Sequence, residues 1–68
     1  MALTREITAF DIVEFVERID DAPAGARGGV LELREGGIAM VEITEPVLDG
    51  AARIVFAPLD KLRVIASE

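Results

Sequence analysis

The feature that most limits the fold of this chain is a series of short apolar segments, each bounded by turn-forming residues. Glu35-Gly36-Gly37 predicts a hairpin, and Asp49-Gly50 is typical of the tip of a second turn. Strand-like segments at a spacing of roughly ten residues are typical of small barrels of antiparallel strands. Segments of this character occupy residues 30–34, 38–44, 53–57 and 62–65.

The length of the chain, 68 residues, allows one domain with a small interior. A domain of this size buries only roughly 60% of the surface that its unfolded chain exposes. Cysteine and histidine are both absent, which excludes disulfides and zinc-finger sites as sources of extra stability. Hydrophobic residues nevertheless make up 51% of the chain. This excess of apolar side chains over interior space favours self-association.

The region 10–19 has two interpretations. Its apolar residues recur at helical spacing, which favours a helix packed on a four-stranded sheet. Its many β-branched and aromatic residues favour a strand instead. The residues at helical spacing are Ile12, Phe15, Val16 and Ile19. Residues 1–9 are expected to form an N-terminal arm or a short edge element, and residues 10–66 a single domain.

A series of motifs runs through residues 10–65. An Asp-hydrophobic-Val motif comes first, then a Gly-x-x-Gly loop, a glycine hairpin into a Val-Glu-hydrophobic strand, a short strand with a 3₁₀ turn, and a final Leu-Arg-Val. The corresponding residues are Asp11-Ile12-Val13, Gly25-Ala-Arg-Gly28 before Val30-Leu31, Gly37 before Val41-Glu42-Ile43, Ile54-Val-Phe56 with Leu59-Asp-Lys61, and Leu62-Arg63-Val64. In order and spacing these motifs resemble the small stand-alone SH3-like barrel proteins of bacteria and archaea, whose function is not established.

The resemblance implies an all-β fold: a small SH3-like barrel of five short antiparallel strands with one 3₁₀ turn before the last strand. It favours the strand over the helix in the region 10–19. It transfers no binding or catalytic residue to this chain. Some proteins of this kind act as partners of neighbouring gene products, which implies a role in binding.

The charge balance limits the classes of partner. Thirteen acidic residues against seven basic ones give a net charge of −6. Nucleic acids and anionic membrane surfaces are bound mainly through lysine and arginine, so neither is an expected partner. The chain has no apolar run of membrane-spanning length, and residues 1–6 lack the order of a signal peptide. A cytoplasmic location is therefore expected.

The residue types that enzymes use most are scarce in this chain. Histidine, cysteine, tyrosine, tryptophan, asparagine and glutamine are all absent, which favours a protein without catalytic activity or cofactor. The stretch 25–29 lacks the Lys-Ser/Thr of a phosphate-binding loop and is interpreted as a turn. Neighbouring carboxylates are interpreted as solvated faces rather than as a Mg²⁺ or Ca²⁺ site, because no EF-hand-type loop is present. These acids are Glu14, Glu17, Asp20, Asp21, Glu42 and Glu45.

Sorting the apolar residues by strand face divides them into an interior set and an outward set. The expected interior set is Val13, Phe15, Leu31, Leu33, Ala39, Val41, Ile43, Ile54, Phe56, Leu62 and Val64. The expected outward set is Ile12, Val16, Val30, Ile38, Met40, Val55 and Ile65. So many outward apolar residues on a small chain favour a patch that is buried against another copy.

The sequence therefore predicts a non-enzymatic protein-binding module that forms a homodimer or larger oligomer. Its acidic rims favour a basic protein as a further partner. Two alternatives stay open: a small-ligand or catalytic site formed only between subunits, and an accessory domain of a larger complex. The predicted interface residues are Ile12, Val16, Ile38, Met40, Val55 and Ile65.

Overall fold

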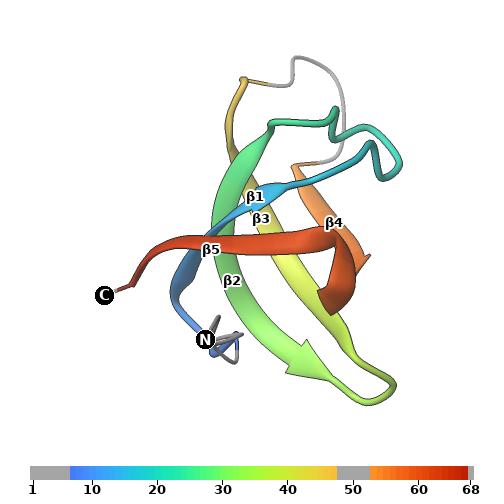
Figure 1. Ribbon diagram of the computed structural model, residues 1–68, viewed down its shortest axis with the longest axis vertical. Helices are drawn as coiled ribbons and strands as arrows, with labels where there is room; N and C mark the ends of the chain where they lie inside the picture. The colour runs from blue at the N-terminus through green and yellow to red at the C-terminus, as the bar shows by residue number, and fades with distance from the viewer. Residues whose placement is uncertain (1–6, 48–52, 68) are drawn as a thin grey trace, which may run out of the picture.

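The computed structural model describes residues 7–47 and 53–67 and contains five β-strands and one short 3₁₀ helix there (Figure 1). The elements are β1 (Asp11–Phe15), β2 (Arg27–Arg34), β3 (Ile38–Glu45), β4 (Ile54–Pro58), η1 (Leu59–Lys61) and β5 (Leu62–Ser67). The prediction of an all-β fold with a 3₁₀ turn before the last strand is confirmed. No helix in these residues is long and apolar enough to cross a membrane. The Asp49-Gly50 turn and residues 1–6 of the expected arm lie outside the described residues.

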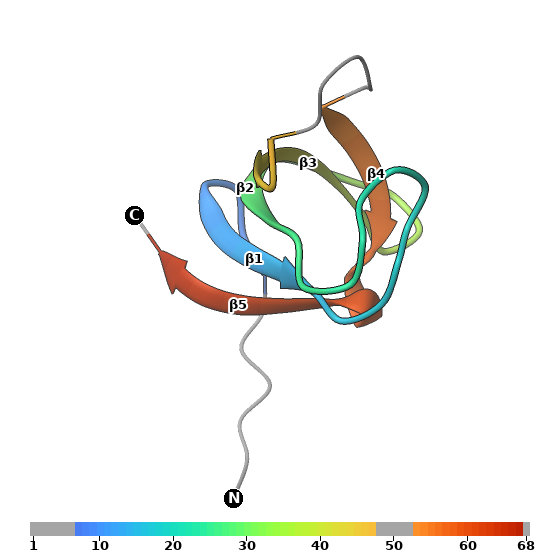
Figure 2. The same ribbon diagram turned by 90° about the horizontal axis from the view of Figure 1, so that it is seen from above.

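The strands form one antiparallel sheet in the order β4-β3-β2-β1-β5. Seen from above, the sheet curls so that its strands surround a common interior (Figure 2). Its two edge strands, β4 and β5, are not hydrogen-bonded to each other, so the sheet is not closed. Curling lets a single small sheet bury one face against itself.

The region 10–19 forms a strand only over β1, which ends where the chain enters a long loop to β2. The base of this loop is held by two backbone hydrogen bonds, from Phe15 N–H to Ala26 O (2.8 Å) and from Gly25 N–H to Phe15 O (2.8 Å). Near its tip, Ile19 and Ala22 bond each other through both backbone groups. The alternative of a helix in this region is therefore wrong.

The β2–β3 hairpin depends on glycine at two places. Gly36 and Gly37 have φ angles of +83° and +74° in the predicted turn, a conformation that L side chains rarely adopt. Gly28 lies so close to β3 that an added Cβ atom would stand 2.2 Å from the carbonyl oxygen of Glu42. The absence of a side chain at residue 28 therefore lets β2 and β3 pair across the curl of the sheet.

The core consists of the inward-facing side chains of all five strands together with two alanines of the β1–β2 loop. Phe15 is the largest fully buried side chain, and Val13, Val30 and Val41 are the next largest apolar ones. The partly buried side chains Leu59 and Val64 pack against this cluster. The buried residues are Val13, Phe15, Ala22, Ala26, Val30, Ala39, Val41, Ile43, Val55, Ala57 and Leu62.

The predicted face of β4 is wrong. Val55 and Ala57 are buried, whereas Ile54 and Phe56 are 45% and 47% exposed. Register with β3 causes this reversal, because Val55 pairs with the inward Val41 and paired residues lie on the same face of a sheet. β4 thus buries its smaller apolar residues and exposes its larger ones.

The predicted interior positions on β2 are also wrong. Leu31 and Leu33 are exposed, and Val30 is buried instead. The register shifts between Val30 and Glu32, so Leu31 is an extra residue that has no partner on β3. This bulge takes Leu31 out of the alternation. Leu33 pairs with the inward Ala39 and so lies on the predicted face, but its side chain is left exposed there.

Candidate interaction surface

Four apolar residues on the outer face of β3 and β4 form the main candidate for a binding surface. Met40 pairs with Phe56 across the two strands, Ile38 pairs with Pro58, and Ile54 pairs with Glu42. Ile38 and Met40 are half-buried, and Ile54 and Phe56 are exposed. We name this surface the β3–β4 strip and define it as Ile38, Met40, Ile54 and Phe56.

A charged side chain from the neighbouring strand lies over part of the strip. The guanidinium carbon of Arg34 is 5.3 Å from the centre of the Phe56 ring, within range of a cation–π interaction. Arg34 Nε also lies 3.4 Å from Glu32 Oε2 on the same strand. Both of these charged groups belong to β2, and Glu42 on β3 lies opposite Ile54, so charged side chains border the four apolar residues of the strip.

The structure separates the six predicted interface residues. Ile38 and Met40 lie on the outer face of β3, within the strip. Val55 is 3% exposed, so its placement on an outward face is wrong. Ile12 lies on β1 opposite Gly29, and Val16 and Ile65 are exposed at the end of β1 and on β5, outside the strip.

Sequence reasoning missed Ile54 and Phe56, which are the most exposed members of the strip. Residues 54–57 are all apolar, so no polar residue marks the side of β4 that faces solvent. Only the pairing of β4 with β3 places Ile54 and Phe56 outside.

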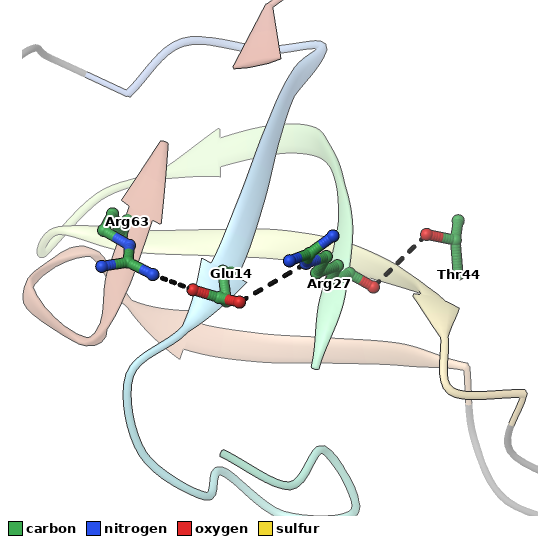
Figure 3. A network of polar contacts seen from close by, with 4 residues as sticks. All are labelled: Glu14, Arg27, Thr44 and Arg63. Carbon is green, nitrogen blue, oxygen red and sulfur yellow. Dashed lines mark hydrogen bonds and ion pairs between the residues drawn. The ribbon is translucent and has the colours of Figure 1, made fainter. Parts of the chain in front are cut away.

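A second cluster on the sheet consists of alternating charges across three strands. Glu14 on β1 accepts hydrogen bonds from Arg63 on β5 and from Arg27 on β2, the latter at 3.4 Å from Nε to Oε2 (Figure 3). The Thr44 hydroxyl donates to the carbonyl oxygen of Arg27 and so extends this network to β3. The hydrogen bond from Arg63 is the main cause that lowers the pKa of Glu14 below its ordinary value, and Arg27 adds to it.

Two of the six acids predicted for the acidic rim form ion pairs with basic residues of the same chain. Glu14 is held between two arginines, and its side chain is only 16% exposed. Glu17 Oε1 lies 3.1 Å from Lys61 Nζ, and this contact raises the pKa of Lys61. The other four acids predicted for the rim, Asp20, Asp21, Glu42 and Glu45, are exposed.

A buried carboxylate orders the turn before β1. The Oδ2 atom of Asp11 accepts hydrogen bonds from the backbone N–H and from the hydroxyl of Thr8, at 2.8 and 3.1 Å. Asp11 N–H donates to Thr8 O at 3.2 Å and closes the turn. The first residue of the Asp-hydrophobic-Val motif therefore has a structural role in this chain.

Small-ligand and metal sites have weaker support in the described part of the chain. An open hollow of about 340 Å³ is lined by Gly25, Arg27, Glu45 and Pro46. Arg27 in this lining is already hydrogen-bonded to Glu14. Within residues 7–47 and 53–67, no group of three or more acidic side chains gathers in a way that could hold a metal ion.

Comparison with family models, with curated proteins and with solved structures finds no match to this chain.

Proposed function

We propose that this all-β chain is an SH3-like barrel. Two observations support this proposal. The strand order β4-β3-β2-β1-β5, with β1 paired to both β2 and β5, is the order expected of such a barrel, and η1 lies between the last two strands. The curl of the sheet round one core agrees with this class of fold (Figure 2).

We propose further that the chain is a non-enzymatic protein-binding module that self-associates through the β3–β4 strip. The observation that carries this proposal is the arrangement of β4, which exposes Ile54 and Phe56 while it buries Val55 and Ala57. Covering the strip would remove these apolar side chains from water, which is the main favourable term in protein association. It would also give a chain of this size additional buried apolar surface.

The charge distribution allows two copies to come close at the strip. Two copies that each carry a net charge of −6 repel each other, so they can meet closely only where acidic groups are few. The strip itself contains no charged residue; at its border Glu42 lies opposite Ile54, Glu32 lies opposite Met40, and Arg34 adds one positive charge beside Phe56. A second copy is therefore the occupant that we propose for this surface.

The proposal is tested by the substitution Phe56→Asp, with Phe10→Asp as the matched control. Phe10 is 65% exposed and precedes β1, outside the strip, so its substitution adds the same charge to another exposed phenylalanine. Sedimentation velocity at micromolar concentrations should show an oligomer for the natural chain and for Phe10→Asp, and a monomer for Phe56→Asp. A natural chain that is monomeric at all these concentrations would contradict self-association. Equal dissociation by both variants would show that the strip is not the contact surface.

A further inference from the structure

The backbone of β4 has one side that no other residue among 7–47 and 53–67 uses. Arg53 O accepts a hydrogen bond from Ile43 N–H at 2.7 Å, and Leu59 N–H donates to Gly37 O at 2.8 Å. Backbone groups of successive residues in a strand point to alternate sides. Residues 53, 55, 57 and 59 therefore face β3. The N–H and C=O groups of Ile54 and Phe56 point away from the sheet, at its edge.

The free side of β4 lacks the features that usually protect an edge strand. Proteins commonly block such edges with charged side chains, with proline or with a covering segment. β4 contains no charged residue over Ile54–Pro58, and Pro58, although it lies on the free side, is the last residue of the strand and leaves the N–H groups of Ile54 and Phe56 open. Among the described residues, no backbone hydrogen bond reaches the outward groups of Ile54 or Phe56. The other edge strand, β5, carries Arg63.

We propose that β4 pairs with β4 of a second copy in an antiparallel manner, across a two-fold axis at Val55, so that the two sheets become continuous. This proposal rests on the proposed function and specifies how the strip is used. In this register Ile54 lies opposite Phe56 of the second copy, and each such pair exchanges both N–H···O hydrogen bonds. All the outward backbone groups of Ile54 and Phe56 are then satisfied.

The side chains fit the same register. Paired residues of antiparallel strands lie on one face, so each Ile54 contacts the Phe56 ring of the other copy on the outer face. Contacts between β-branched and aromatic residues are among the favourable cross-strand pairs. Ile54 and Phe56 of the two copies then cover one another in part, while Ile38 and Met40 stay on the outer face one strand away, and the two-fold axis makes the contact closed and self-complementary. Glu42 of each copy stays one strand away from the contact, on β3.

Amide hydrogen exchange measured by NMR on the intact natural chain tests this arrangement directly. The amides of Ile54 and Phe56 should exchange quickly in dilute solution. At concentrations at which the chain associates, their exchange should be slower by a factor of about ten or more. The amides of Val55 and Ala57 are the internal control, because they face β3 and are protected within each copy. Their exchange should change much less with concentration.

The outcomes of this measurement separate the two proposals. Slow exchange at Phe56 that appears together with association supports β4 pairing. Association without new protection at Ile54 and Phe56 overturns β4 pairing and leaves a face-to-face contact through the strip as the proposed function. No association at any concentration overturns both.

A pair of variants at one position provides a second test. Phe56→Pro removes the outward N–H and leaves the bonds between β4 and β3 in place, whereas Phe56→Val keeps that N–H and an apolar, β-branched side chain. Circular dichroism and thermal melting check that both variants fold. The Val variant should still dimerise, and the Pro variant should be monomeric. A folded Pro variant that dimerises as well as the Val variant would overturn the pairing. If the Pro variant does not fold, the exchange measurement decides.

Discussion

The guanidinium carbon of Arg34 lies 5.3 Å from the centre of the Phe56 ring, although β3 separates the strands to which the two residues belong. Arg34 pairs with Ile38, and Ile38 pairs with Pro58, so the arginine side chain reaches across one strand to the ring. The apolar stem of an arginine can cover apolar surface while its charge stays in water. Arg34 therefore gives partial cover to the strip in a single copy.

This contact predicts a small effect of Arg34→Ala on the stability of the isolated chain. The free energy of unfolding should fall by about 0.5–1 kcal/mol, the usual range for an exposed cation–π pair. Urea unfolding in dilute solution measures this change. Glu32→Gln should have a smaller effect, because exposed ion pairs contribute little. In a Phe56→Leu background the effect of Arg34→Ala should largely disappear, and an unchanged effect there would show that the ring is not involved.

The reversed face of β4 predicts unequal effects of threonine at two adjacent positions. Val55→Thr places a hydroxyl in the core and should lower the free energy of unfolding by about 1–3 kcal/mol. Ile54→Thr places the same β-branched residue on the exposed face and should cost less than about 1 kcal/mol. Thermal or urea unfolding compares the two variants. If Ile54→Thr were the more damaging substitution, the observed register of β4 would be wrong.

The close approach of β2 to β3 predicts that Gly28→Ala is severely destabilising. Its Cβ atom would stand 2.2 Å from Glu42 O, so one of the two strands would have to shift. We expect a loss of about 3 kcal/mol or more, at the upper end for overpacking. Gly29→Ala is the matched control, because the nearest atom to its Cβ would be 3.9 Å away, on Ile12. That variant should stay within about 1 kcal/mol of the natural chain, and equal losses would contradict the packing at residue 28.

The Glu14 network predicts a loss of stability in acid. Its pKa in the folded chain is lowered from the ordinary value of 4.5, chiefly by the hydrogen bond from Arg63. The folded state therefore favours the charged carboxylate. The stability that Glu14 contributes is present above 4.5 and is lost as the pH falls through the lowered value. Urea unfolding from about pH 6 to about pH 3 should show a weaker loss for Glu14→Gln than for the natural chain.

The cause of the Glu14 shift can be tested separately. Arg63→Ala removes the strongest hydrogen bond to the carboxylate, so NMR titration of the Glu14 carboxyl carbon should find a pKa closer to the ordinary value. Arg27→Ala should have a smaller effect, because its contact is longer and its hydrogen bond is the weaker cause. A larger effect of Arg27→Ala would reverse the assignment of the main partner.

Much of the strand pattern could be predicted because it depends on local signals. Glycine at residues 36 and 37 indicated the hairpin, and both have positive φ angles in the structure. The alternation of β3 correctly placed Ala39, Val41 and Ile43 inside. On β1, periodicity did not decide between helix and strand, and the family resemblance favoured the strand that is observed.

The candidate surface was predicted only in part. Ile38 and Met40 were recovered because β3 alternates regularly, so its outer face could be deduced from the residues alone. Ile54 and Phe56 were missed because every residue from 54 to 57 is apolar. Without a polar residue to mark the solvent side, a shift of one residue in register exchanges the two faces.

The sequence by itself indicated the strands from residue 30 onward, the hairpin at Gly36-Gly37 and the excess of apolar residues over interior space, because these depend on composition and on local backbone preference. Only the tertiary structure decided which apolar residues are outside. The bulge at Leu31 and the pairing of Val55 with Val41 determine which residues of β2 and β4 face the interior. Both depend on the register between neighbouring strands, which the local sequence pattern does not specify. Phe56 is exposed because the pairing with β3 directs Val55 and Ala57 into the interior.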